Sequence, residues 1–241
     1  MQNNDLLYEA TIKPLERFGF IHPFFDVNTD TVLSTFVALL FIIALSICAN
    51  FFITHKGLVS KALISYIEMF SEFAQQSLAK PTAGHISFVA SLFTFILLCN
   101  FTPIIPWLEE PTKDINTTLA LALISFFYVQ YNSIKINGIK NYFHEFFQPF
   151  FLMFPLHVIG KLTSIVSLCF RLFGNIFGGF IISSLYHKLT HISFFTQIFG
   201  LLSGMNLAMI LVFCIFEGTI QAFVFSILTL TYLSMELSED K

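Results

Sequence analysis

The chain has 241 residues, of which 56% are hydrophobic and only 11% charged, and its net charge is −3. A soluble domain carries about 25% charged residues, so this composition and a mean hydropathy of +0.77 exclude a water-soluble globular protein. The sequence contains no basic patch or nucleic-acid-binding motif, and it predicts an integral membrane protein.

Long apolar runs predict where the chain crosses the membrane, because about 20 apolar residues span the hydrocarbon core as a helix. After a polar N-terminal segment, residues 1–30, such runs cover residues 31–54, 86–108 and 115–134. Residues 57–80 carry apolar and polar positions at helical spacing, which predicts an amphipathic helix on the membrane surface.

A shorter apolar run, residues 146–160, is interrupted by two prolines. Because proline breaks a regular helix, this run predicts a broken or re-entrant hairpin. We expect one membrane domain, residues 1–241, with peripheral helices in residues 31–145 and a pair of long helices in residues 146–241.

Two longer apolar blocks follow, residues 162–187 and 189–232. As one helix, the second block would be about 60 Å long, which is twice the hydrocarbon core. We therefore expect it to break near Gly200 and Gly204 or to lie strongly tilted. The predicted fold is an all-α polytopic membrane protein of about five to six membrane helices, the last two long and tilted, plus the surface helix.

Positive residues predict the orientation, because Lys and Arg concentrate in cytoplasmic connections. The segments after the first and third spans hold Lys56, Lys61, Lys80, Lys135 and Lys140. By contrast, residues 109–114 hold one lysine and three acids, so this loop and the N-terminus are predicted to face outward. We expect a bacterial inner membrane first and an organellar membrane second.

Only two arginines occur, and Arg171 lies in the middle of an apolar block. Arginine at membrane depth costs at least about 2.5–3.5 kcal/mol, so it indicates a partner or a water-filled cavity. Since arginine keeps its proton, Arg171 cannot relay protons, but it can attract a carboxylate and block a proton short circuit. The alternatives are snorkelling to the interface and pairing within the protein.

The neighbours of Arg171 form a row of small and polar residues at three- and four-residue spacing. The row consists of Ser164, Ser167, Arg171, Gly174, Asn175 and Gly178. This spacing places them on one helix face. Because small residues let another helix approach closely, the face predicts a contact surface around Arg171.

Glu217 is the only charged residue of the block 189–232. Gln221 lies four residues later, on the same helix face, and Cys214 lies three residues earlier. A carboxylate at membrane depth can take up and release protons, so Glu217 suits a proton stop in an access channel. The alternative is an ion pair with Arg171.

The sequence predicts no cofactor, no metal site and no enzyme activity of the chain by itself. Its four cysteines are scattered through apolar runs, which argues against disulfides and a metal site. His187 and His191 have a spacing that could suit a metal, but their position beside Lys188 favours interfacial histidines.

Three stretches resemble one family. Residues 167–179, SLCFRLFGNIFGG, are similar to the signature of the a subunit of F-type ATP synthases. Residues 218–232, GTIQAFVFSILTLTY, resemble that family's last helix, and residues 111–118, PTKDINTT, resemble its loop into the third span. The resemblance is strong over residues 86–235, with the motifs in the same order and at the same spacing.

The resemblance implies a proton-translocating subunit of the membrane (F0) sector, with the c-subunit ring, the b subunits and the rest of the complex as partners. In that family two long tilted helices face the ring, and two offset half-channels lead protons to and from its carboxylates. Arg171 matches the arginine that faces these carboxylates, and Asn175 and Gln221 match polar positions of the same surface. Four further residues are candidates for lining the channel: Asn116, Ser167, Cys214 and His187.

The sequence departs from the family pattern at three places. The family commonly has an acid nine residues after the arginine, where this chain has Phe180. It commonly has His or Glu seven residues before the glutamine, where this chain has Cys214. An acidic pair often precedes the arginine helix, where this chain has Gly160 and Lys161. We expect Glu217, one turn from Cys214, to take the outer half-channel role.

Three other classes of protein stay open. A secondary transporter that uses Arg171 to bind an anionic substrate predicts internal symmetry, which the sequence lacks. A membrane-embedded enzyme needs clustered His, Asp and Glu, and a structural assembly subunit leaves Arg171 unexplained. The sequence also leaves open whether the ion is H⁺ or Na⁺, because in this family the ring mainly decides that choice.

Overall fold

The computed structural model describes residues 11–12, 27–53, 57–78, 81–105, 108, 110–145, 153–190 and 204–238. The helices are α1 (Thr29–Ile53), α2 (Leu58–Ser77), α3 (Ala83–Phe101), α4 (Ile115–Glu145), α5 (Phe154–Thr190), α7 (Met205–Met209) and α8 (Gly218–Ser238). Two short 3₁₀ turns, η3 (Thr102–Ile104) and η4 (Pro111–Lys113), lie between α3 and α4, and a π-helical segment, η6 (Ile210–Glu217), joins α7 to α8. Two-residue strands, β1 (Thr11–Ile12) and β2 (Val27–Asn28), pair antiparallel before α1.

The predicted membrane helices are confirmed. Among the described residues, five helical stretches are long and apolar enough to cross a membrane: Thr31–Ala49, Ala83–Ile104, Ile115–Ile136, Phe154–Tyr186 and Leu207–Leu237. The predicted amphipathic helix is α2, which is not one of these five stretches. Phe70 and Ala74 of α2 and Leu78, which follows its end, are buried, whereas its acids Glu68 and Glu72 are exposed.

The predicted hairpin at residues 146–160 is wrong for the part that the structure describes. Residues 154–160 are the first turns of α5, continuous with the segment that carries Arg171. Pro155 is the second residue of this helix, where a missing backbone N–H removes no helical hydrogen bond. Residues 146–152, which include the other proline, lie outside the described residues.

The last apolar block breaks as predicted. Gly204 has a φ of +66°, a left-handed conformation that glycine adopts without strain, and α7 begins at the next residue. Gly200 lies outside the described residues. From Met205 onward α7, η6 and α8 form one continuous rod, which we call the α7–α8 rod.

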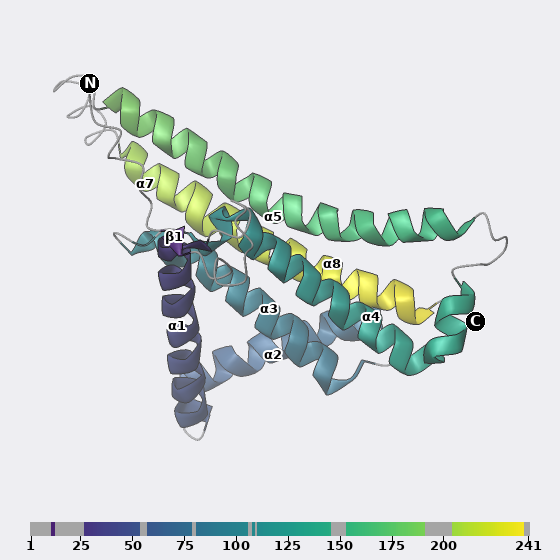
Figure 1. The fold of residues 1–241 in the computed structure, drawn as a ribbon. Coiled ribbons are helices and arrows are strands. Elements are labelled where there is room, and N and C mark those ends of the chain that lie inside the picture. The colour runs from purple at the N-terminus through teal and green to yellow at the C-terminus, as the bar shows by residue number, and fades with distance from the viewer. Residues whose placement is uncertain are drawn as a thin grey trace.

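The core lies where α2, α3, α4, α5 and α8 meet (Figure 1). Ile96 of α3, Leu172 of α5 and Phe225 of α8 are completely buried there. Helix α1 stands to one side of the bundle (Figure 1), and most of its large apolar residues are exposed. Large exposed apolar side chains at this position suit contact with lipid or with another membrane chain.

Helix α5 and the α7–α8 rod run along each other and are steeply inclined to α1 (Figure 1). The 37 residues of α5 measure about 55 Å, which agrees with the predicted long and tilted pair. One end of the pair lies near the start of α1 and the loop between α3 and α4, which the sequence predicts to face outward. We call this the outer end, and the opposite end, beside the end of α4, the inner end.

Candidate functional site

Arg171 lies on an open face of α5. Its side chain is exposed, and within the described part of the chain it forms no ion pair with Glu217 or any other acid. Gly174 and Gly178 follow on the same helix, and no neighbouring atom of this chain comes within 4 Å of the place where a β-carbon would stand. The face around Arg171 is therefore not covered by the described parts of this chain.

A cavity of about 500 Å³ lies between α5, η6 and the loop from α3 to α4. We call it the outer cavity, because it lies toward the outer end of the helix pair. Its polar and charged lining includes Asn100, Glu110, Lys113, Asn175, Glu217 and Gln221. The structure thus brings together three of the four predicted ion-path residues, Asn175, Glu217 and Gln221, and also Cys214.

Asn175 and Gln221 connect the two long helices across the outer cavity. The Nδ2 of Asn175 donates a hydrogen bond of 3.3 Å to Oε1 of Gln221. Gln221 is only 5% exposed, and its Nε2 has no acceptor among the described residues. An unpaired buried donor costs free energy, so this amide suits contact with water or with a group from another chain.

Asn100 of α3 lines the outer cavity and connects α3 to the start of α8 and to η4. This residue was not predicted from the sequence. It is 2% exposed; its Nδ2 donates to the Gly218 carbonyl oxygen at 3.0 Å, and its Oδ1 accepts from the Thr112 hydroxyl at 3.0 Å. A β-carbon on Gly218 would lie 3.0 Å from Asn100 Cβ, so glycine permits the close approach of α3 to α8. A lone asparagine in an apolar span was the available signal.

The π-helical segment η6 shapes the wall that carries Cys214 and Glu217. Such segments interrupt the regular helical hydrogen bonds and are frequent at functional sites. Here the π-helix ends at Glu217, and the cavity is lined by residues on both sides of this end. A hydropathy pattern does not distinguish π- from α-helix, so this feature was not predictable.

Glu110 is the second acid of the outer cavity and was also missed. It lies in the loop outside the spans, and the Sγ of Cys214 donates to its Oε1 at 3.9 Å. Burial raises the pKa of Glu110 to about 7, because a buried carboxylate loses hydration. Three residues on, Nζ of Lys113 lies 3.8 Å from the centre of the Phe180 ring. No sequence signal marks such a loop acid, since most are solvated.

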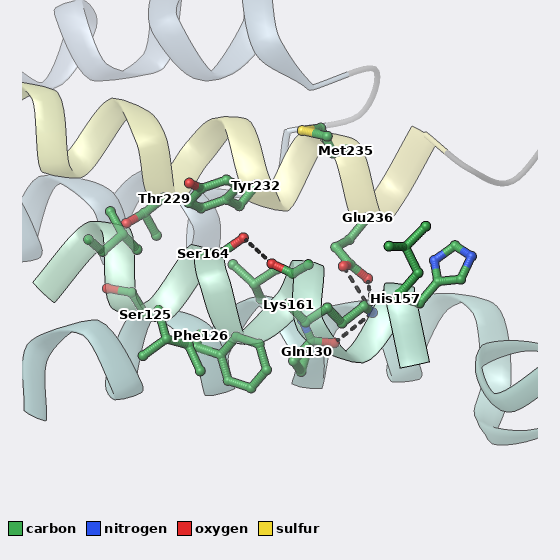
Figure 2. Close-up of a pocket in the computed structure, with 15 residues that line it drawn as sticks. Ser125, Phe126, Gln130, His157, Lys161, Ser164, Thr229, Tyr232, Met235 and Glu236 are labelled. Atoms are coloured by element: carbon green, nitrogen blue, oxygen red, sulfur yellow. Dashed lines mark hydrogen bonds and ion pairs between the residues drawn. The ribbon is translucent and has the colours of Figure 1, made fainter. Parts of the chain in front are cut away.

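A second cavity, of about 320 Å³, lies at the inner end between α4, α5 and α8 (Figure 2). We call it the inner cavity. Figure 2 shows Glu236 of α8 pointing toward Lys161 of α5, whose Nζ lies 3.0 Å from both carboxylate oxygens. The same Nζ donates to Oε1 of Gln130 at 3.2 Å and to the Tyr142 hydroxyl at 3.4 Å. Lys161 thus joins α4, α5 and α8.

Three other candidate channel-lining residues lie elsewhere. Asn116 is the second residue of α4, and its backbone N–H donates to Asp114 Oδ1 at 2.9 Å. Ser167 is half-buried on α5, and neither residue lines the outer or the inner cavity. His187 belongs to α5, but its side chain lies outside the described residues. Their predicted role stays a prediction. No group of three or more metal-ligating side chains occurs among the described residues.

Comparison with known proteins agrees with this arrangement. The family model described as ATP synthase A chain matches residues 32–234. An ATP synthase subunit a from Moorella thermoacetica is 33% identical over 210 residues, which cover 85% of this chain and 89% of the relative. One from Acidothermus cellulolyticus is 30% identical over 213 residues, 84% of this chain and 74% of the relative. One from Aliarcobacter butzleri is 38% identical over 159 residues, 64% of each. The chain belongs to the ATP synthase A chain family.

Proposed function

We propose that this chain is the a subunit of a rotary ATP synthase and that it conducts protons through two half-channels. The outer and inner cavities are the two half-channels, and Arg171 faces the carboxylates of a c-subunit ring between them. The chain is not catalytic by itself: it couples proton flow to ATP synthesis through its partners, the c-ring, the b subunits and the rest of the complex.

The observation that carries this proposal is the position of Arg171 along α5. Residues of α5 on one side of it, including Lys161 and Ser164, line the inner cavity, and residues on the other side, including Asn175 and Ser183, line the outer cavity. Arg171 itself lies on the uncovered face between these two groups. A fixed positive charge at this point blocks direct proton passage, because it repels protons and attracts the carboxylate that carries them.

Glu217, Gln221 and Asn175 then form the polar route from the outer cavity to the ring. Glu217 supplies a carboxylate that takes up and releases protons, and the paired amides supply polar groups without net charge. The free Nε2 of Gln221 supports an additional contact beyond this chain. We assign H⁺ as the transported ion and a bacterial plasma membrane as the location, in line with the bacterial relatives.

The test is ATP-driven acidification of vesicles that contain the whole complex, with wild type compared with Arg171→Ala. We expect the variant to assemble and to lose pumping, because ring carboxylates lose their fixed counter-charge. Arg17→Ala, which removes the only other arginine, is the matched control and should pump normally. Normal pumping by assembled Arg171→Ala would overturn the proposal. Sodium uptake in place of acidification would overturn the assignment of H⁺.

A further inference from the structure

The outer cavity contains more titratable groups than the ion path described so far uses. Its lining holds two acids, Glu110 and Glu217, one lysine, Lys113, and one thiol, Cys214. Glu217 belongs to the span Leu207–Leu237, whereas Glu110 lies between two spans. The two carboxylates therefore enter the cavity from different elements, one from the loop and one from the membrane helix.

Glu110 is held inside this cavity without a neutralising partner. The Cys214 thiol donates a hydrogen bond to its Oε1 at 3.9 Å, and no described cation forms an ion pair with it. The surrounding walls from α5 contribute Asn175, Ile176, Gly179, Phe180 and Ser183, and α3 contributes Asn100, none of which is charged. The described charges that face Glu110 are thus Lys113 on η4 and Glu217 on η6.

The loop holds Glu110 in a defined position. Thr112, two residues on, is fully buried and donates to Asn100, and Pro111 begins the 3₁₀ turn η4. Lys113 closes the same turn and covers the Phe180 ring of α5. The residues that follow Glu110 are therefore fixed to α3 and α5, so the carboxyl group has a defined place in the cavity.

We infer that Glu110 is the proton acceptor of the outer cavity, which takes protons from the outer aqueous phase and passes them toward Glu217. This inference rests on the proposed function. A hydronium ion gives its proton to the Glu110 carboxylate and becomes water. The neutral acid gives the proton to the Glu217 carboxylate, directly or through water, and becomes a carboxylate again.

The protonation behaviour of Glu110 agrees with that role. The pKa of Glu110 is raised to about 7: burial is the largest cause, the Cys214 thiol and Lys113 oppose it, and the negative charge of Glu217 adds to it. A group whose pKa lies near the working pH both accepts and releases protons readily. Below about pH 7 on the outer side Glu110 is mostly protonated, and above it mostly ionised.

The test is ATP synthesis by reconstituted complex in vesicles, driven by a constant membrane potential, while the pH of the compartment facing the outer cavity is varied across neutrality. We expect the wild-type rate to fall as that pH rises through about 7, because fewer Glu110 side chains carry a proton. Glu110→Gln should lower the rate by about tenfold and remove this inflection. Asp114→Asn is the matched control, because it removes a charge in the same loop but outside the cavity. It should change neither the synthesis rate nor the inflection.

Glu110→Asp separates a proton-accepting role from a structural one. It keeps a carboxyl group with a shorter reach, so the inflection should persist, displaced in pH, at a reduced rate. A Glu110→Gln enzyme that keeps the wild-type inflection would overturn the inference, whether or not its rate falls. If Glu110→Gln does not assemble, an inflection at the wild-type pH in Glu110→Asp would overturn it. Loss of pumping in Arg171→Ala with a normal profile in Glu110→Gln would reject only this inference and leave the proposed function standing.

Discussion

The outer and inner cavities both lie along α5, on either side of Arg171, but they differ in whether their carboxylates form ion pairs. In the outer cavity, Glu110 and Glu217 have no ion-pair partner among the described residues. In the inner cavity, Glu236 is held by Lys161 through both carboxylate oxygens. An ion pair fixes a carboxylate in place, whereas a carboxylate in a cavity without such a partner can exchange protons. The comparison supports the proposed proton uptake through the outer cavity, whereas the ion pair of the inner cavity fixes α5 to α8.

Among changes to the two cavities, the largest expected effect comes from removing both outer acids. A Glu110→Gln/Glu217→Gln variant should lower proton-driven ATP synthesis by at least about 100-fold, because no carboxylate then remains in the described lining of the outer cavity. Rates in reconstituted vesicles check this against a Glu68→Gln/Glu72→Gln control, which removes two exposed acids of α2. A double variant that synthesises ATP at the wild-type rate would break the distinction between the cavities.

The inner ion pair gives the second prediction. Lys161→Glu places two carboxylates together, and Glu236→Lys places two ammonium groups together, so each should destabilise the helix contact by about 2 kcal/mol. The double reversal restores opposite charges and should recover most of that loss. Resistance of the purified complex to SDS measures the effect. Equal loss in the double variant would mean that the hydrogen bonds to Gln130 and Tyr142, not the pair, hold this end together.

The smallest expected effect concerns Lys113. Its positive charge favours the ionised form of Glu110 and so lowers the pKa of that group. Lys113→Met should therefore move the inflection of the synthesis rate to higher outer pH, while Lys113→Arg should leave it near the wild-type value. The same vesicle assay measures both variants. A shift to lower pH in Lys113→Met would contradict the assigned electrostatics.

Much of the helical architecture and part of the site were predictable from sequence. The spans follow from apolar length, and the break at Gly204 follows from the mismatch between an apolar block and the membrane. Asn175, Glu217 and Gln221 were predicted together, and the structure brings them to one cavity. These predictions succeed because periodicity and membrane thickness constrain single helices strongly.

Contacts between distant segments were not predictable in the same way. Pro155 suggested a hairpin, although proline in the first turn of a helix removes no hydrogen bond. Lys161 and Glu236 are 75 residues apart, and their pairing depends on how α5 packs on α8. In the sequence, Glu110 does not differ from the other acids of its loop. Its burial depends on η6 and α5, which are distant along the chain. Tertiary packing decides each of these cases, and a pattern along the chain does not contain it.

The length of α5 has a further consequence for the direction of proton movement. Its apolar part, Phe154–Tyr186, has 33 residues and is about 50 Å long. Within a hydrocarbon core of about 30 Å, such a rod leans about 50° from the membrane normal, compared with about 20° for an average membrane helix. Its two ends are then displaced sideways by about 40 Å, more than the core is thick. The two cavities are therefore separated mainly along the plane of the membrane, so in the proposed function the carrier of a proton from one to the other has to travel sideways.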